Sequence, residues 1–237
     1  MRKIVFIGLM LLGLLGCQRK EKYTDIELMP FIYENYLQDA KQLYMREIYA
    51  DTLHDNYHNP VLDTNEIIRI LKIFQAVYNC PEPEAELVFN HSIHAFKLFS
   101  LNTIRITVDT CLEESANLLE GRIPTGIDEL DNLLSLYHFD SIHSFYPNLP
   151  VVSLHSREDY HLLPITKQLA KISPVLSADI DMYMGDGNNI LLNRGDDESI
   201  IIFSIGFGDC PAGCLHRKNW QFKIKNNKAE FMKYFQN

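Results

Sequence analysis

Apolar residues recur at helical spacing through the first part of the chain. The stretch 28–53 places them at roughly helical intervals, and a stronger pattern of the same kind covers 65–78. The sequence Cys80-Pro81-Glu82-Pro83 ends this second pattern, because proline interrupts helical hydrogen bonding. Residues 84–99 fit either a third helix or strands. Residues 25–100 are therefore expected to form a mainly helical region.

After residue 102 the pattern changes to the alternation of polar and apolar residues that is typical of half-buried strands. The expected elements are strands at 103–108, 141–145, 151–155 and 175–184, and helices at 126–137 and 159–172. Their order is β-α-β-β-α-β, which is the order of the ferredoxin-like split βαβ unit. Subtilisin-type inhibitory propeptides share this order, although the likeness is one of element order alone.

Beyond Gly185 the pattern predicts strands only. An apolar run covers 200–205, and two alternating runs at 220–225 and 229–235 flank the turn signal Asn226-Asn227. The prediction for the whole chain is an α+β fold with a helical N-terminal part, a ferredoxin-like unit in the middle and C-terminal antiparallel β-hairpins. Residues 101–237 form the α+β region of this division.

The N-terminus is typical of an export signal. Arg2 and Lys3 precede an uncharged apolar run from Ile4 to Leu15. These 12 residues are too few to span a bilayer, which needs about 20, but they match the apolar core of a signal peptide. Residues 1–16 are therefore expected to be removed from the mature chain.

The end of this run, Leu14-Leu15-Gly16-Cys17, resembles the lipobox of bacterial lipoproteins. The resemblance implies that Cys17 is lipidated with palmitate-like acyl chains and that residues 17–24 form a lipidated tether. Several acyl chains give stable membrane anchoring. Residue 18 is Gln rather than the Asp associated with retention in the inner membrane. The expected location is the cell envelope, with the chain on the outer membrane rather than the inner one.

Composition and charge narrow the class of protein. The chain has 237 residues, of which 46% are hydrophobic, so it can bury a globular core and is not disordered. Its formal net charge of −9 argues against nucleic-acid binding, which requires a basic surface.

Five cysteines are present, and assigning Cys17 to the lipid leaves four. An oxidising compartment favours disulfides among an even set. Cys210 and Cys214 lie in a short turn-rich segment, which favours a local bridge and leaves Cys80 to pair with Cys111. Two alternatives stay open: a redox-active pair, and a zinc site that adds His216 but has no clear fourth ligand.

The C-terminal segment 179–237 carries two turn motifs. Gly185-Asp186-Gly187-Asn188 precedes an apolar strand, and Gly208-Asp209-Cys210-Pro211-Ala212-Gly213-Cys214 precedes a strand with Trp220. Together they resemble the C-terminal segment of many secreted or lipid-anchored bacterial proteins. In that pattern a His often follows the second cysteine by four residues, where this chain has Lys218. The resemblance implies export and a bridged loop, and it carries no assigned activity.

Two groups of residues suggest metal binding. Asp179, Asp181, Asp186 and Asn188 offer oxygen ligands beside a Gly-rich turn, as calcium prefers, although they do not fit the EF-hand template. The pairs His54/His58 and His91/His94 have spacings that place two imidazoles on one helix face, as zinc or copper sites do. Neither pair has the Glu of HExxH. No cofactor is otherwise indicated.

No nucleophile motif, phosphate-binding loop or dinucleotide-binding motif occurs in the sequence. The sequence therefore favours a non-enzymatic, lipid-anchored envelope protein that binds a protein, peptide or glycan. One alternative is a metal-dependent hydrolase that uses the histidine pairs. The other is a propeptide-like protease inhibitor, based on the predicted β-α-β-β-α-β order.

Overall fold

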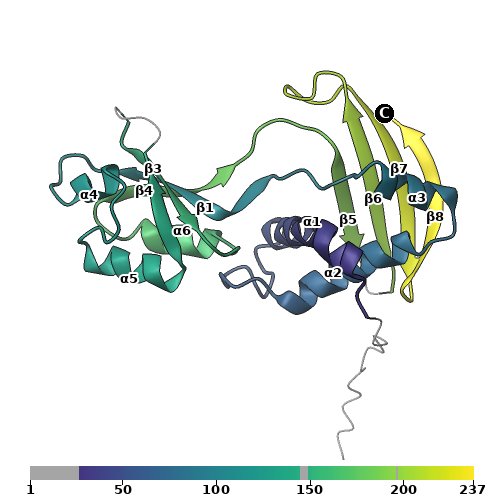
Figure 1. The fold of residues 1–237 in the computed structure, drawn as a ribbon, viewed down its shortest axis with the longest axis horizontal. Helices are drawn as coiled ribbons and strands as arrows, with labels where there is room; N and C mark the ends of the chain where they lie inside the picture. The colour runs from purple at the N-terminus through teal and green to yellow at the C-terminus, as the bar shows by residue number, and fades with distance from the viewer. Residues whose placement is uncertain (1–26, 145–148, 196) are drawn as a thin grey trace, which may run out of the picture.

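The computed structural model describes residues 27–144, 149–195 and 197–237 of the chain. Six helices and eight strands occur in these residues, and they form two units that lie next to each other (Figure 1). This mixed content confirms the predicted α+β class. The expected signal segment and tether, including Cys17, lie outside the described residues.

The N-terminal helices are α1 (Pro30–Ala50), α2 (Thr64–Tyr78) and α3 (Pro83–Asn90). The side chain of Asp63 caps α2 by accepting a hydrogen bond of 2.8 Å from the backbone N–H of Asn65. Such a cap satisfies one of the free N–H groups at a helix start. The third helix ends at Asn90, so residues 91–98 form an irregular connector rather than more helix.

The C-terminal strands form one antiparallel sheet in the order β5-β6-β7-β8. Their bounds are β5 (Asn189–Arg194), β6 (Ser199–Phe207), β7 (His216–Lys225) and β8 (Lys228–Gln236). Asn226 and Asn227 connect the last two strands with φ values of 50° and 57°. Tight hairpins need this left-handed backbone at both central residues, and Asn tolerates it. The predicted hairpin is confirmed.

Helices α1–α3 cover one face of this sheet (Figure 1). Phe74 of α2 and Phe89 of α3 meet Phe203 of β6, each pair of ring centroids being 6.0 Å apart. Phe222 and Trp220 of β7 complete the same core. The first helices and the last strands of the chain therefore bury one another, although about 100 residues separate them.

The middle of the chain builds the second unit. Its elements are β1 (Phe99–Val108), α4 (Ser115–Leu119), α5 (Asp128–Leu136), β2 (Phe139–His143), β3 (Val151–Ser156), α6 (Leu163–Leu169) and β4 (Val175–Met182). The sheet order is β2-β3-β1-β4, and every neighbouring pair is antiparallel. β3 lies between β1 and β2, and β1 lies between β3 and β4, so each βαβ connection is split by another strand. This is the predicted ferredoxin-like unit, with the short helix α4 added.

The middle unit has its own core. Ile104 and Ile106 of β1 and Leu154 of β3 point to one face, where Leu134 of α5 and Ile165 of α6 cover them. The sequence pattern changes near residue 100, where helix gives way to strand. The core of the middle unit begins slightly later, since it is built from residues 104–180, whereas Leu101 at the start of β1 still packs in the core of the other unit.

Two connectors, residues 91–98 and 183–188, join the units, and a polar interface lies beside them. The Lys41 ammonium of α1 pairs with the Asp159 carboxylate at 2.7 Å. His161 is fully buried between the units, with its Nδ1 3.1 Å from the Asn59 carbonyl oxygen. Burial lowers the pKa of His161, so the imidazole is neutral at neutral pH.

No helix in the described part of the chain has the length and apolar character needed to cross a membrane.

Candidate functional site

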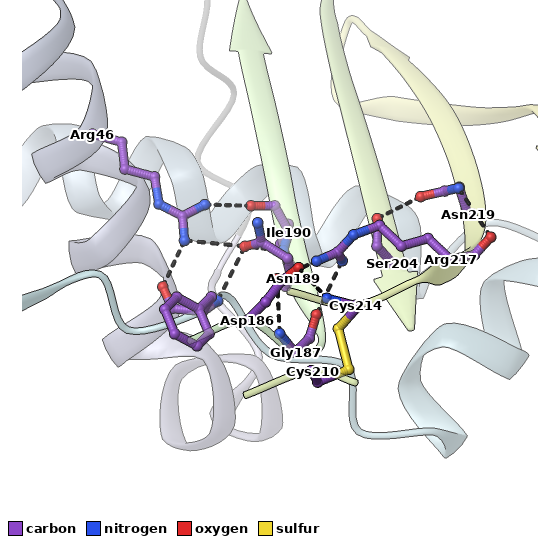
Figure 2. A network of polar contacts seen from close by, with 11 residues as sticks. Arg46, Asp186, Gly187, Asn189, Ile190, Ser204, Cys210, Cys214, Arg217 and Asn219 are labelled. Carbon is purple, nitrogen blue, oxygen red and sulfur yellow. Dashed lines mark hydrogen bonds and ion pairs between the residues drawn. A yellow bond between two sulfur atoms is a disulfide. The ribbon is translucent and has the colours of Figure 1, made fainter. Parts of the chain in front are cut away.

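The two turn motifs near the C-terminus meet at one place in the structure (Figure 2). The Asp186 carboxylate accepts hydrogen bonds from the backbone N–H groups of Gly187 at 2.8 Å and Cys214 at 3.0 Å, and it forms an ion pair with Arg217. The hydrogen bond from Arg217 is the main reason that the pKa of Asp186 lies below its usual range. This carboxylate therefore holds the two turns together.

The predicted local disulfide joins Cys210 and Cys214 at this same place. A Cβ atom added to Gly206 would lie 2.3 Å from the Cys214 sulfur and 2.8 Å from the Gly187 carbonyl oxygen. Neither distance leaves room for a side chain. Gly206 is therefore required by the close approach of the bridged loop to the first turn.

Asn189 and Arg46 extend the network toward the helices (Figure 2). The Arg46 guanidinium donates to the Ile190 carbonyl at 2.7 Å, the Phe96 carbonyl at 2.6 Å and the Asn189 side-chain oxygen at 3.0 Å. The same Asn189 oxygen accepts from the Phe96 backbone N–H at 3.1 Å. Helix α1, the connector 91–98 and strand β5 are thereby joined. Asp186, Asn189 and Arg46 bind other groups of the protein, which makes this network structural.

The predicted calcium ligands are not brought together. Asp179 and Asp181 lie on β4 of the middle unit, where Asp181 pairs with Arg105 at 2.6 Å. Asp186 is bound to Arg217 of the other unit. Residues 183–188 cross from one sheet to the other, so short separation in sequence does not make Asn188 a neighbour of the β4 carboxylates.

The predicted histidine pairs do not share helix faces. Helix α1 ends at Ala50, so His54 and His58 lie in the irregular segment that follows it. His91 caps the end of α3, and His94 lies in the connector beyond it. The prediction was wrong because both helices end before these histidines, so the spacing within each pair does not place the two rings on one helix face.

His94 instead pairs with a carboxylate of α1. Its Nδ1 lies 2.8 Å from an oxygen of the buried Asp39, and its ring stacks on Tyr36 with centroids 5.1 Å apart. The other Asp39 oxygen accepts a hydrogen bond from the Ala95 backbone N–H. The hydrogen bond to Asp39 raises the pKa of His94. This contact attaches the connector to α1.

A second histidine contact, which the sequence analysis did not predict, lies on the uncovered face of the middle sheet. The rings of His143 on β2 and His155 on β3 are 5.1 Å apart, and His155 Nδ1 lies 3.0 Å from the Thr103 hydroxyl. Burial, followed by the nearby His143, lowers the pKa of His155. Pairing of β2 with β3 creates this contact, and nothing in the local sequence indicates it.

Across the residues the structure describes, no three His, Cys, Asp or Glu side chains are grouped so that they could hold a metal ion. The zinc alternative at Cys210, Cys214 and His216 also loses two ligands, because the two sulfurs are bonded to each other.

Cys80 and Cys111 are free thiols, so the predicted second bridge is not present. Cys80 packs against the core that α1–α3 share with the C-terminal sheet. Strand β1 begins beside that unit, where Phe99 contacts Tyr49 of α1, and then runs away from it for 10 residues. At about 3.3 Å per residue, the strand carries Cys111 far from Cys80.

A cavity of about 1110 Å³ lies between α1, α2 and strand β5. The Arg194 guanidinium pairs there with both oxygens of Glu47 and, at 2.7 Å, with Glu66. Glu66 also pairs with Arg69 at 2.5 Å. These charges satisfy one another, which indicates that the network fastens the helices to the sheet.

A second cavity has a different character. It measures about 590 Å³ and lies between α3 and the ends of three strands. We name it the α3 groove and define it by Glu84, Leu87, His91, Ile205, Phe207, Lys218, Trp220 and Tyr234. Glu84 and Leu87 lie on α3, and His91 caps its end. Their spacing of three and four positions places them on one side of the helix.

The α3 groove combines a buried aromatic base with an exposed apolar rim. Trp220 forms the base with 6% of its surface exposed, and its ring lies 5.5 Å from that of Tyr234. Leu87, Phe207 and Tyr234 are each 40–44% exposed. The Lys218 ammonium lies 5.9 Å from the centre of the Phe207 ring. Concave, mainly apolar sites with few polar groups are the usual form of binding pockets.

The sequence pattern indicates Trp220 and the bridged loop but not the α3 groove. The signal it lacked is the partnership of α3 with β6–β8, which are more than 100 residues away. Leu87 and Phe207 look like ordinary core positions in the sequence pattern, and only their exposure in the structure distinguishes them.

Comparisons with family models, with curated proteins and with solved structures found no match for this chain.

Proposed function

We propose that this chain is a lipid-anchored protein of the cell envelope that binds a partner polypeptide in the α3 groove, without catalysis. The α3 groove is the observation that carries this proposal. It exposes large apolar side chains around a recess of about 590 Å³, which has the size of a small-molecule site or of a pocket for a few side chains. Binding energy at protein interfaces is concentrated in such pockets, where aromatic and aliphatic anchors are buried.

The composition of the groove favours a polypeptide over a glycan. A sugar ring stacks on an open aromatic face, whereas Trp220 is 6% exposed and forms the floor. The accessible surface comes instead from Leu87, Phe207 and Tyr234. Glu84 and Lys218 supply one negative and one positive charge in the same lining. An apolar peptide side chain with flanking polar groups matches this arrangement.

The test is crosslinking from within the groove in producing cells. A photoreactive amino acid replaces Leu87 in the full chain, and a matched variant carries it at Leu136, an exposed leucine on α5 of the other unit. We expect a discrete polypeptide adduct from position 87 only. Adding Phe207→Asp should remove this adduct, because it places a charge in the apolar recess.

The same adducts from both positions, or an adduct at position 87 that survives Phe207→Asp, would contradict the proposal. Phe207 is 40% exposed, so the substitution leaves the core intact. An unchanged circular dichroism spectrum confirms that the variant is folded.

The anchor is proposed from the sequence. Arg2, Lys3, the apolar run and Cys17 support lipidation, and Gln18 supports the outer membrane. Metabolic labelling with palmitate should mark the wild-type chain and fail to mark Cys17→Ala. Label retained by the variant would refute the assignment.

A second function is favoured by one observation, the strand order β2-β3-β1-β4 of the middle unit. Inhibitory propeptides of subtilisin-type proteases share the element order of this unit. The purified chain should then inhibit a subtilisin-type protease without being rapidly degraded. Cleavage of the chain with no loss of protease activity would eliminate this alternative.

A further inference from the structure

The second face of the C-terminal sheet has a composition unlike the rest of the chain. Helices α1–α3 cover the face formed by alternate residues such as Phe203 and Phe222. The residues between them point to the opposite face, because successive side chains of a strand alternate. One cross-strand row on that face is Leu191–Ile202–Gln221–Lys233. We call this surface the open face.

Positive charge is concentrated on the last two strands. Residues 216–237 contain six Lys and Arg residues but one acidic residue, in a chain of net charge −9. Of these six, Arg217 pairs with Asp186, and Lys218 lines the α3 groove. The remaining four are Lys223, Lys225, Lys228 and Lys233.

The register places these four lysines on the open face together. Lys225 is paired with Lys228 across the hairpin, and Lys223 is paired with Glu230 in the next row. The Lys223 ammonium lies 3.5 Å from the Glu230 carboxylate, which partly neutralises it. Lys233 lies with its ammonium 4.9 Å from the centre of the Phe235 ring. The open face therefore carries an excess of positive charge.

Apolar side chains continue the open face across the neighbouring strands. Leu191 on β5 is 51% exposed, and Ile200 and Ile202 on β6 are half-buried beside it. The helices of this unit lie on the opposite side of the sheet (Figure 1). The result is a broad strand surface with lysines along one side and aliphatic groups along the other.

We propose that the open face lies against the anionic headgroups of a phospholipid membrane. Each lysine near such a surface contributes about 1 kcal/mol of attraction, and long lysine side chains allow neighbouring apolar groups to reach the headgroup boundary. This assignment rests on the proposed anchoring at Cys17, which would hold the chain beside the membrane.

An acidic polypeptide offers the same charge, but the exposed aliphatic side favours lipid. Leu191 is 51% exposed and shares a cross-strand row with Lys233. A membrane provides headgroups and the start of the apolar layer side by side. A charged, flexible peptide provides negative charge but no apolar layer beside it.

The test is lysine footprinting on the full-length chain. The chain is reconstituted into vesicles of phosphatidylcholine alone or with added phosphatidylglycerol, exposed to an amine-acetylating reagent, and analysed by mass spectrometry. We expect severalfold less acetylation of the four open-face lysines in the anionic vesicles. Lys97 and Lys171, which are exposed elsewhere, should react equally in both. High salt should restore the reactivity of the four.

A matched pair of variants completes the experiment. Lys225→Gln combined with Lys228→Gln should weaken the additional affinity for anionic vesicles about 30-fold, from about 1 kcal/mol for each charge. Lys97→Gln combined with Lys171→Gln should have no effect. All four positions are exposed, so neither variant disturbs a core.

Equal acetylation in both vesicle types would overturn the proposal. Protection by soluble polyglutamate without protection by anionic vesicles would also overturn it, in favour of an acidic protein partner. Failure of the proposed anchor is distinguishable from failure of the open face. Without an anchor the chain would not stay with neutral vesicles, whereas binding to anionic vesicles would still test the open face.

Discussion

Gly206 offers a direct test of the network that joins the two C-terminal turns. Replacing it with Ala adds one methyl group that would lie 2.3 Å from the Cys214 sulfur and 2.8 Å from the Gly187 carbonyl oxygen. Both atoms are held, one by the disulfide and one by a backbone turn that Arg217 and Asp186 fix. The methyl group can be accommodated only by moving one of the two segments.

The expected cost of Gly206→Ala is about 3 kcal/mol, at the upper end of the usual range for overpacking, because two rigid atoms are involved. Removing the disulfide with Cys210→Ala and Cys214→Ala eliminates the sulfur contact but leaves the carbonyl contact. In that background the cost of the same substitution should fall to about 1–2 kcal/mol.

The assay is urea unfolding of the four proteins in this cycle, followed by circular dichroism. Gly187→Ala is the matched control, because its nearest new contact is a ring carbon of Phe96 at an ordinary 3.9 Å. It should change the free energy of unfolding by no more than about 0.5 kcal/mol. The same cost for Gly206→Ala with and without the disulfide would refute the reasoning.

Three further predictions follow from other contacts. The hydrogen bond with Asp39 raises the pKa of His94, so this contact stabilises the fold fully below the ordinary value of 6.5 and loses its effect as pH rises through the raised pKa. The difference in free energy of unfolding between wild type and His94→Gln should therefore shrink with rising pH. A difference that grows would contradict the pairing. Arg194→Met should cost about 2 kcal/mol in urea unfolding, because it leaves the half-buried Glu47 without a cation, whereas Glu66 keeps its pairing with Arg69. A cost below about 0.5 kcal/mol would show that the Arg194 network does not stabilise the fold. A thiol reagent should modify the exposed Cys111 faster than the half-buried Cys80, as mass spectrometry can follow, and resistance of both thiols would indicate that they are bonded.

Prediction from sequence succeeded where neighbours along the chain decide the structure. The alternating pattern at 103–108 and the turn at Asn226-Asn227 both report the local backbone, and both are confirmed. The bridge between Cys210 and Cys214 spans five residues in a turn-rich segment, so its partners meet whatever the rest of the fold does.

Prediction failed where a helix or a connector ended the local pattern early. The pairs His54/His58 and His91/His94 depended on helices that stop at Ala50 and Asn90. The acidic residues near Asp181 and Asp186 were read as one cluster, although the connector between them leads from one sheet to the other. In each case the predicted distance between side chains assumed a regular local backbone, and the chain does not adopt that backbone at these positions.

The sequence by itself determined the class of fold, the element order of the middle unit, the C-terminal hairpin and the local disulfide, because hydrophobic periodicity and turn residues act over a few positions. Only the tertiary structure decided that the first helices cover the last sheet. That pairing separates Cys80 from Cys111, forms the α3 groove from α3 and β6–β8, and leaves the four lysines on the uncovered side of the sheet. The physical reason is that burial of apolar surface is non-directional. It requires that the apolar faces of the helices be covered, but only the packing of the whole chain specifies that the C-terminal sheet covers them.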